Sequence, residues 1–209
     1  MKNHGMLFLF CLAFVGTAVG QRSDKLARYF ADPVLTDSLS TLFFPTQYNE
    51  GFLSTNKIAL WGSYYANIVV YNFLTDSSIP LFAADTYIEA FRRPDYMRIT
   101  ENTKIKNITN KWVFLLVKSK DYNDSGRIDG NDPSILYAAT TKGEGLRPLT
   151  NETENVVSFE FFEKQGFGLI KIQRDSDKDF SFKNNDADFY FRKIDLENLT
   201  LGKPIEAKR

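Results

Sequence analysis

Two acidic stretches in the second half of the chain have the residue types and the spacing needed to hold a calcium ion. Calcium takes about six to eight oxygen ligands, and a twelve-residue loop supplies them from positions 1, 3, 5, 7, 9 and 12. The first stretch, loop 1, covers residues 121–132, and the second, loop 2, covers residues 175–186. The spacing predicts one calcium site in each loop.

Loop 1 fills every ligand position. Its expected ligands are Asp121, Asn123, Ser125, the backbone carbonyl of Arg127, Asp129 and Asp132. Gly126 stands at position 6, where the chain must turn sharply in a left-handed conformation. Ile128 at position 8 is apolar and can anchor the loop to the core. The alternative interpretation is a solvated turn built from Asp, Asn and Gly.

Loop 2 follows the same spacing with two departures. Its expected ligands are Asp175, Asp177, Asp179, the backbone carbonyl of Ser181, and Asp186. Phe180 replaces glycine at position 6 and makes the turn costlier, while Lys183 at position 9 cannot ligate a metal. Four neighbouring carboxylates repel one another unless a cation is present. We therefore expect calcium here as well, with a plain acidic surface turn as the alternative.

Both loops end in Asp, whose short side chain reaches an ion in bidentate fashion less readily than Glu does. We expect modest affinity, roughly 10⁻⁵ to 10⁻³ M, as in extracellular modules. Such sites stabilise structure and do not sense a signal. Magnesium fits less well, because it demands tight octahedral geometry and gives up water reluctantly.

Residues 1–20 have the pattern of a secretory signal peptide. Lys2 precedes an apolar run at residues 6–15, and the small residues Ala18 and Gly20 stand before a cleavage point. The alternative is an uncleaved signal anchor. No later apolar stretch approaches transmembrane length, so we expect a periplasmic or secreted protein with no membrane span in the mature chain.

Cleavage would remove the only histidine, His4, and the only cysteine, Cys11. The mature chain would then lack disulfides, cysteine nucleophiles, Ser–His–Asp triads and ordinary zinc sites, which need thiols or imidazoles. The 26 basic and 26 acidic residues of the full sequence cancel, and no basic run indicates a nucleic-acid partner.

The elements that must position the loops are short runs of β-branched and aromatic residues, typical of strands. They cover residues 57–61, 67–73, 112–117, 135–139, 156–161, 168–172 and 189–194, with short edge strands near 146–150 and 202–205. Residues 88–99 are ambiguous between strand and helical turn. Residues 21–56, with Pro33 and Pro45, are expected to be irregular apart from a short helix near residues 23–30. The expected division is a signal peptide (1–20), an irregular segment (21–56) and a β-rich repeat domain (57–209).

The repeat domain reads as two copies of strand, acidic loop, strand, turn and short edge strand. Loop 1 resembles the loops of EF-hand and dockerin proteins, although strands flank it here. Leu136–Tyr137 and the run Leu146, Arg147, Pro148, Leu149 and Thr150 resemble TolB-type β-propeller repeats of exported bacterial proteins, over about residues 110–205 with a fainter echo at 57–82. The resemblance implies an all-β, propeller-like antiparallel meander, incomplete or irregular, with calcium loops between strands.

We expect a non-enzymatic module that carries structural Ca²⁺ and binds an extracytoplasmic protein or glycan. Tyr64, Tyr65 and Tyr122 are aromatic candidates for contact with a partner, or else packing residues. The alternative function is a carbohydrate-active hydrolase with a carboxylate pair, because that chemistry needs neither His nor Cys. Its candidates, by residue type alone, are Glu89, Glu160 and Glu163. A purely structural or surface-attached protein is the third interpretation.

Overall fold

The computed structural model describes residues 28–37, 39–48, 64–92, 111–182 and 186–207. The expected signal peptide and the strand expected at residues 57–61 lie outside these ranges. Within the described ranges, no helix has the length and apolar character needed to cross a membrane.

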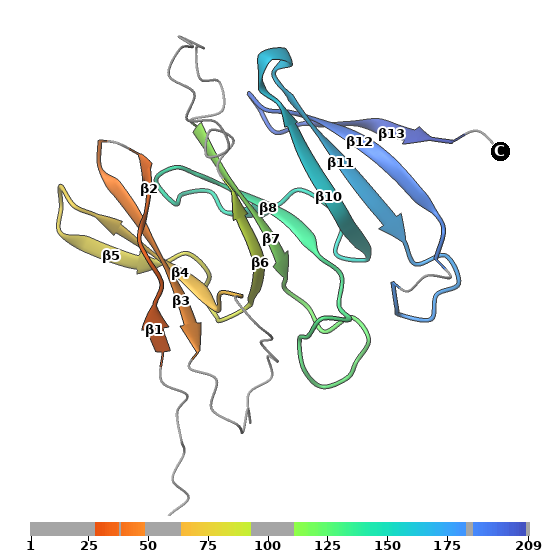
Figure 1. Ribbon diagram of the computed structural model, residues 1–209, viewed down its shortest axis with the longest axis horizontal. Coiled ribbons are helices and arrows are strands. Elements are labelled where there is room, and N and C mark those ends of the chain that lie inside the picture. The colour runs from red at the N-terminus through yellow and green to blue at the C-terminus, as the bar shows by residue number, and fades with distance from the viewer. Residues whose placement is uncertain (1–27, 38, 49–63, 93–110, 183–185, 208–209) are drawn as a thin grey trace, which may run out of the picture.

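The protein is built from three antiparallel sheets, each formed by consecutive strands (Figure 1). Sheet 1 contains β1 (Arg28–Phe30), β2 (Val34–Asp37), β3 (Thr41–Tyr48), β4 (Asn67–Asn72) and β5 (Ser77–Pro80). Sheet 2 contains β6 (Tyr87–Arg92), β7 (Trp112–Lys118), β8 (Ile135–Thr140) and β9 (Arg147–Pro148). Sheet 3 contains β10 (Glu154–Phe162), β11 (Phe167–Arg174), β12 (Phe189–Asp195) and β13 (Leu201–Glu206). Among the described residues there is no α-helix, and a 3₁₀ turn lies at Glu163–Gln165. The predicted all-β, irregular antiparallel meander is confirmed.

Residues 28–48 correct the expectation of an irregular N-terminal segment. They form β1, β2 and β3, and the helix expected near residues 23–30 is replaced, over Arg28–Phe30, by strand β1. Both β1 and β2 pair with the same edge of β3, so they act as one outer strand with an interruption. The carbonyl of Pro45 in β3 accepts a 2.8 Å hydrogen bond from the Ala31 amide at that interruption. Opposite residues of such an antiparallel pair normally exchange two hydrogen bonds, and Pro45 has no N–H to donate the second. The outer strand is interrupted at this point.

The second half of the chain folds close to expectation. Strands β7, β8, β10, β11 and β12 begin and end within one or two residues of the runs predicted from the sequence. The ambiguous stretch 88–99 begins within β6, which ends at Arg92. Continuous runs of β-branched and aromatic residues favour strands that are buried on both faces.

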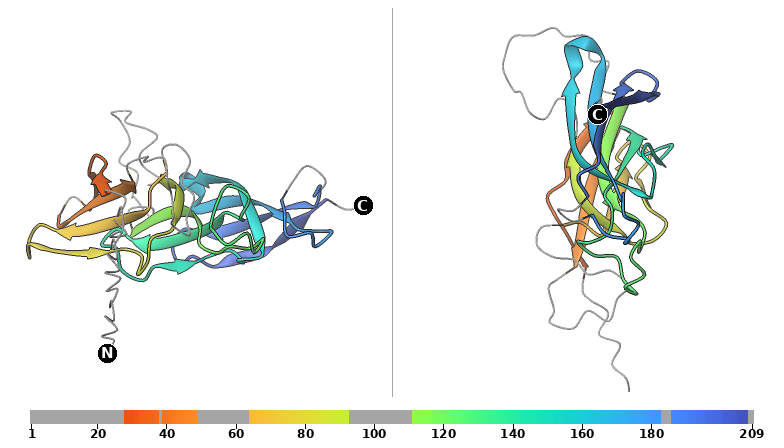
Figure 2. Two further views of the ribbon diagram at one scale, coloured as in Figure 1. Left: turned by 90° about the horizontal axis from the view of Figure 1, so that it is seen from below. Right: turned by 90° about the vertical axis from the view of Figure 1, so that its right-hand side faces the viewer.

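Sheet 2 lies between the other two sheets, and its alternating side chains serve both cores. Val113, Leu115 and Val117 of β7 pack with sheet 1 residues in one buried cluster. Phe114 points the other way, into a second cluster with sheet 3. Successive side chains of a strand point to opposite faces, so one apolar strand can supply two cores. Two views of the stack are shown in Figure 2.

Loop 1 joins β7 to β8, and loop 2 joins β11 to β12. The two loops therefore connect the same pair of positions in neighbouring sheets and lie at the same end of those sheets, the lower end in Figure 1. This arrangement places the two acidic loops beside each other.

Candidate metal centre

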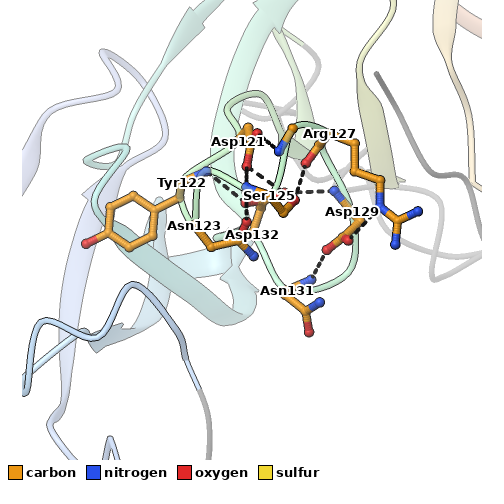
Figure 3. Close-up of polar contacts among 9 residues, drawn as sticks. Asp121, Tyr122, Asn123, Ser125, Arg127, Asp129, Asn131 and Asp132 are labelled. Atoms are coloured by element: carbon orange, nitrogen blue, oxygen red, sulfur yellow. Dashed lines mark hydrogen bonds and ion pairs between the residues drawn. The ribbon is translucent and has the colours of Figure 1, made fainter. Parts of the chain in front are cut away.

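Loop 1 folds around the carboxylate of Asp121 (Figure 3). Its two oxygens accept hydrogen bonds from the amides of Ser125 at 2.9 Å and Gly126 at 2.8 Å. Gly126 has a φ of 88°, and Asp124 at position 4 has a φ of 53°. Position 6 therefore has the left-handed backbone expected from its glycine.

Asp132 closes loop 1 from inside the protein, and the residue is only 2% exposed. Its oxygens accept hydrogen bonds from the amides of Tyr122 at 2.8 Å and Asp129 at 2.7 Å. Burial raises the pKa of Asp132, and the backbone donors oppose that rise. Position 12 is thus held by the loop's own backbone.

The remaining predicted ligands of loop 1 also make bonds within the loop. The Asn123 side-chain oxygen accepts the Ser125 amide at 3.0 Å, and the Ser125 hydroxyl donates to the Arg127 carbonyl at 3.0 Å. Asp129 accepts the amide of Asn131 at 2.8 Å. Carboxylate and carbonyl oxygens keep further lone pairs after one such bond. Loop 1 is preshaped, although the carboxylates of Asp121, Asp129 and Asp132 are not drawn into one tight group.

Loop 2 does bring its carboxylates together. One oxygen from each of Asp175, Asp177, Asp179 and Asp186 lies within 4.8 Å of the other three. Among the described residues, it is the one group of three or more acidic side chains close enough to share a metal ion. Partial desolvation and then the charge of Asp177 raise the pKa of Asp179, which also accepts a backbone hydrogen bond from Ser181. The sequence favoured loop 1, whereas the geometry favours loop 2.

Two buried carboxylate oxygens in loop 2 have no hydrogen-bond partner. They are Asp186 Oδ2 and Asp175 Oδ1, and the whole of Asp186 is only 1% exposed. Buried polar atoms in proteins are nearly always paired, and an unpaired buried charge is costly. A cation bound between the four carboxylates would satisfy both oxygens, so the donor set fits a hard divalent metal.

The two loops share a left-handed backbone at positions 4 and 6 despite their different sequences. Phe180 at position 6 has a φ of 62°, and Lys178 at position 4 has a φ of 60°, matching the corresponding residues of loop 1. Phe180 therefore adopts the left-handed turn despite its side chain, and this backbone strain costs about 1–2 kcal/mol for a residue other than glycine. Lys183 lies outside the described residues.

The hydrogen bonds match as well. The Phe180 amide donates to Asp175 at 3.1 Å, as the position 6 amide of loop 1 does to Asp121. The Ser176 amide donates to Asp186 at 3.0 Å, as the position 2 amide of loop 1 does to Asp132. Equivalent amides hold positions 1 and 12 in both loops, so the shared spacing has produced the same local structure twice.

Tyr122 connects the two loops, a role that the sequence did not reveal. Its hydroxyl donates a 3.0 Å hydrogen bond to Asp175 Oδ2, and its ring lies 5.5 Å from the rings of both Phe180 and Phe182. Burial, followed by the bond to Asp175, raises the pKa of Tyr122 to about 12. Tyr122 thus packs against loop 2.

Each loop also has a polar side chain beneath it. Lys118, only 4% exposed, donates to the Asp132 carbonyl and, at 3.0 Å, to the Ser134 hydroxyl. Gln173 donates to the Asp186 carbonyl at 3.0 Å. Both side chains come from the strand that enters the loop and secure its position 12. Nothing in the local sequence marks them for this role.

The residues considered for hydrolysis belong to neither loop, although Glu89 contacts Lys118 at the base of loop 1. Glu89 pairs with Lys118 at 3.4 Å and lines a cavity of about 450 Å³, while Glu160 lines one of about 300 Å³. Among the described residues, neither cavity is lined by a second acidic side chain, and Glu163 begins the 3₁₀ turn. A hydrolytic carboxylate pair needs two groups facing one substrate bond. The cavities do not supply that arrangement.

Two of the tyrosines considered for partner contact take part in packing. The Tyr64 ring lies 4.4 Å from that of Tyr87, and Tyr65 packs against the core between sheets 1 and 2.

Comparison of the whole chain with protein-family models and with curated protein sequences found no match.

Proposed function

We propose that this protein is an extracytoplasmic, non-enzymatic interaction module whose two acidic loops hold structural Ca²⁺. The observation that carries the proposal is the loop 2 cluster, in which the buried Asp186 Oδ2 lacks a partner among four converging carboxylates. The matching conformation of loop 1 extends the proposal to a second site.

Calcium suits these loops better than other common cations. The donors are all oxygens, which disfavours zinc and copper, and the loops combine exposed and buried carboxylates in irregular geometry. Asp177 and Asp179 are exposed and can move to complete a coordination shell of variable size. We expect dissociation constants of roughly 10⁻⁵ to 10⁻³ M, because position 12 is Asp in both loops.

Bound calcium would stabilise the stack of sheets at one end. Each loop joins adjacent strands of its sheet, and position 12 of each is tied to the strand that enters the loop. A cation removes the repulsion between carboxylates and anchors the loop to its strands. The role of partner surface then falls to the rest of the sheets, which present exposed apolar side chains such as Phe30 and Phe191.

The test is calorimetric titration with Ca²⁺, combined with thermal melts in calcium and in chelator. We expect two binding events and a higher melting temperature in calcium. Asp186→Asn should remove one event, because it neutralises the buried carboxylate at nearly constant volume. Asp188→Asn is the matched control, since Asp188 pairs with Arg174 at 3.4 Å and is not part of the cluster. Absence of both heat and thermal stabilisation up to millimolar calcium would contradict the proposal.

A further inference from the structure

A single residue contacts a candidate ligand in each loop. The Tyr122 amide donates to Asp132 Oδ1 at 2.8 Å, and the Tyr122 hydroxyl donates to Asp175 Oδ2 at 3.0 Å. Asp132 is position 12 of loop 1 and Asp175 is position 1 of loop 2. Tyr122 therefore links the end of one candidate site to the start of the other.

The bond from Tyr122 also fixes how Asp175 faces the cluster. Asp175 Oδ2 accepts both the Tyr122 hydroxyl and the Phe180 amide, the latter at 3.1 Å. The other oxygen, Oδ1, is buried and has no partner. Two donors on one oxygen leave the second one free for a cation. In Figure 3, the Tyr122 ring extends away from the polar centre of loop 1.

A second chain of hydrogen bonds runs beneath the loops. The Ser134 amide, two residues after Asp132, donates to the Asn155 side-chain oxygen at 2.9 Å. Asn155 donates to Gln173 at 3.2 Å, and Gln173 donates to the Asp186 carbonyl at 3.0 Å. The far ends of both loops are thus joined through buried or half-buried side chains.

We propose that the two cation sites are thermodynamically coupled, with Tyr122 as the positioning residue, so that filling one loop raises the affinity of the other. This inference rests on the proposed function. A cation in loop 2 immobilises Asp175, which holds Tyr122, whose amide in turn orders Asp132. The second cation then meets a loop that is already ordered, and shared ordering produces positive coupling.

Repulsion between two cations acts in the opposite direction but is weakened here. The carboxylates of each loop neutralise most of the charge that enters it. Ser125, Asp177 and Asp179 are exposed, so water and salt screen what remains. The direct hydrogen bond through Tyr122 is not screened in this way, and we expect its effect to prevail.

The coupling is measured by calcium titration of the wild type and of two single-loop variants. Asp121→Ala leaves only loop 2 to bind, and Asp177→Ala leaves only loop 1. The coupling factor is the product of the two wild-type association constants divided by the product of the single-loop constants. We expect a factor of roughly 5 to 150, the range typical of coupled sites.

Tyr122→Phe keeps the ring and removes the hydroxyl. In this background, with the same single-loop variants, we expect two binding events and a coupling factor near one. Tyr71→Phe is the matched control, because the Tyr71 hydroxyl donates a 3.0 Å bond to Asp76 in sheet 1, and it should leave the factor unchanged. Two events with a wild-type factor of one or less, or a factor that survives Tyr122→Phe, would overturn the inference. Absence of binding in the wild type would instead overturn the proposed function.

Discussion

Gly126 and Phe180 occupy the sixth position of their loops and share a left-handed backbone, with φ angles of 88° and 62°. Only the glycine adopts this conformation without a steric cost. That Phe180 adopts it too indicates that the surrounding loop imposes the turn. In this conformation the amide of each residue donates a hydrogen bond to the carboxylate at position 1.

Gly126→Ala should therefore destabilise the protein without any steric clash. An added Cβ would meet nothing within 4 Å, so the cost is that of the backbone conformation, about 1–2 kcal/mol. We expect weaker calcium binding at loop 1 as well, measured by titration alongside chemical denaturation. Gly130→Ala is the control, since its Cβ also meets nothing and its backbone is not left-handed. Equal effects of the two substitutions would refute this explanation.

Gly168→Ala tests the packing of sheet 3. Its Cβ would lie 2.7 Å from a ring carbon of Phe159 and 2.9 Å from a methyl group of Ile194, both in the core shared with sheet 2. Such overpacking costs about 1–3 kcal/mol. In Gly202→Ala, the nearest atom is the Lys193 carbonyl oxygen at 3.5 Å, so that control should be close to neutral. The free energy of unfolding of both variants is measured by urea denaturation. No change in Gly168→Ala would show that Phe159 and Ile194 move to make room for the added methyl group.

Lys118→Met should loosen the base of loop 1. The substitution removes the donor to the Asp132 carbonyl and leaves Glu89 without its cation, for a loss of about 1–3 kcal/mol. Lys118→Gln should recover part of the loss, because Gln173 makes the equivalent bond to Asp186 in loop 2. The free energy of unfolding and the calcium affinity of loop 1 are the measurements. If Met and Gln behave alike, the hydrogen bond to the loop is not what Lys118 contributes.

The raised pKa of Tyr190 predicts that the free energy of unfolding falls at high pH. Burial, and then its 2.9 Å hydrogen bond to Glu154, raise the pKa of Tyr190 to about 12. An unfolded tyrosine ionises near pH 10, so between about pH 10 and 12 the folded state retains a proton that the unfolded state loses. The contribution of Tyr190 to the free energy of unfolding is complete below about pH 10 and falls as the pH rises through that window.

Tyr190→Phe has no such proton to lose. Its free energy of unfolding, measured by urea denaturation from about pH 9 to 12, should fall less steeply than that of the wild type. Lysines and other tyrosines titrate in both proteins and cancel in the comparison. Parallel pH profiles would mean that Tyr190 ionises equally well in the folded and unfolded states.

The sequence alone determined the elements whose causes are local. The apolar runs of the second half became β7, β8, β10, β11 and β12, because continuous β-branched and aromatic residues favour buried strands. The spacing of Asp residues, with Gly126 in loop 1, likewise anticipated the bonds between nearby amides and carboxylates that turn the loops. Local rules failed at residues 28–48, where pairing with β4 and the interrupted outer strand accommodate Pro45.

Tertiary structure decided everything that depends on two sheets meeting. The bond from Tyr122 to Asp175 joins residues 53 positions apart and exists only because sheets 2 and 3 place their equivalent loops side by side. The buried, unpartnered oxygen of Asp186 and the support from Lys118 and Asn155 have the same origin. Spacing along a chain specifies a turn, whereas burial and contact between turns follow from how apolar faces stack.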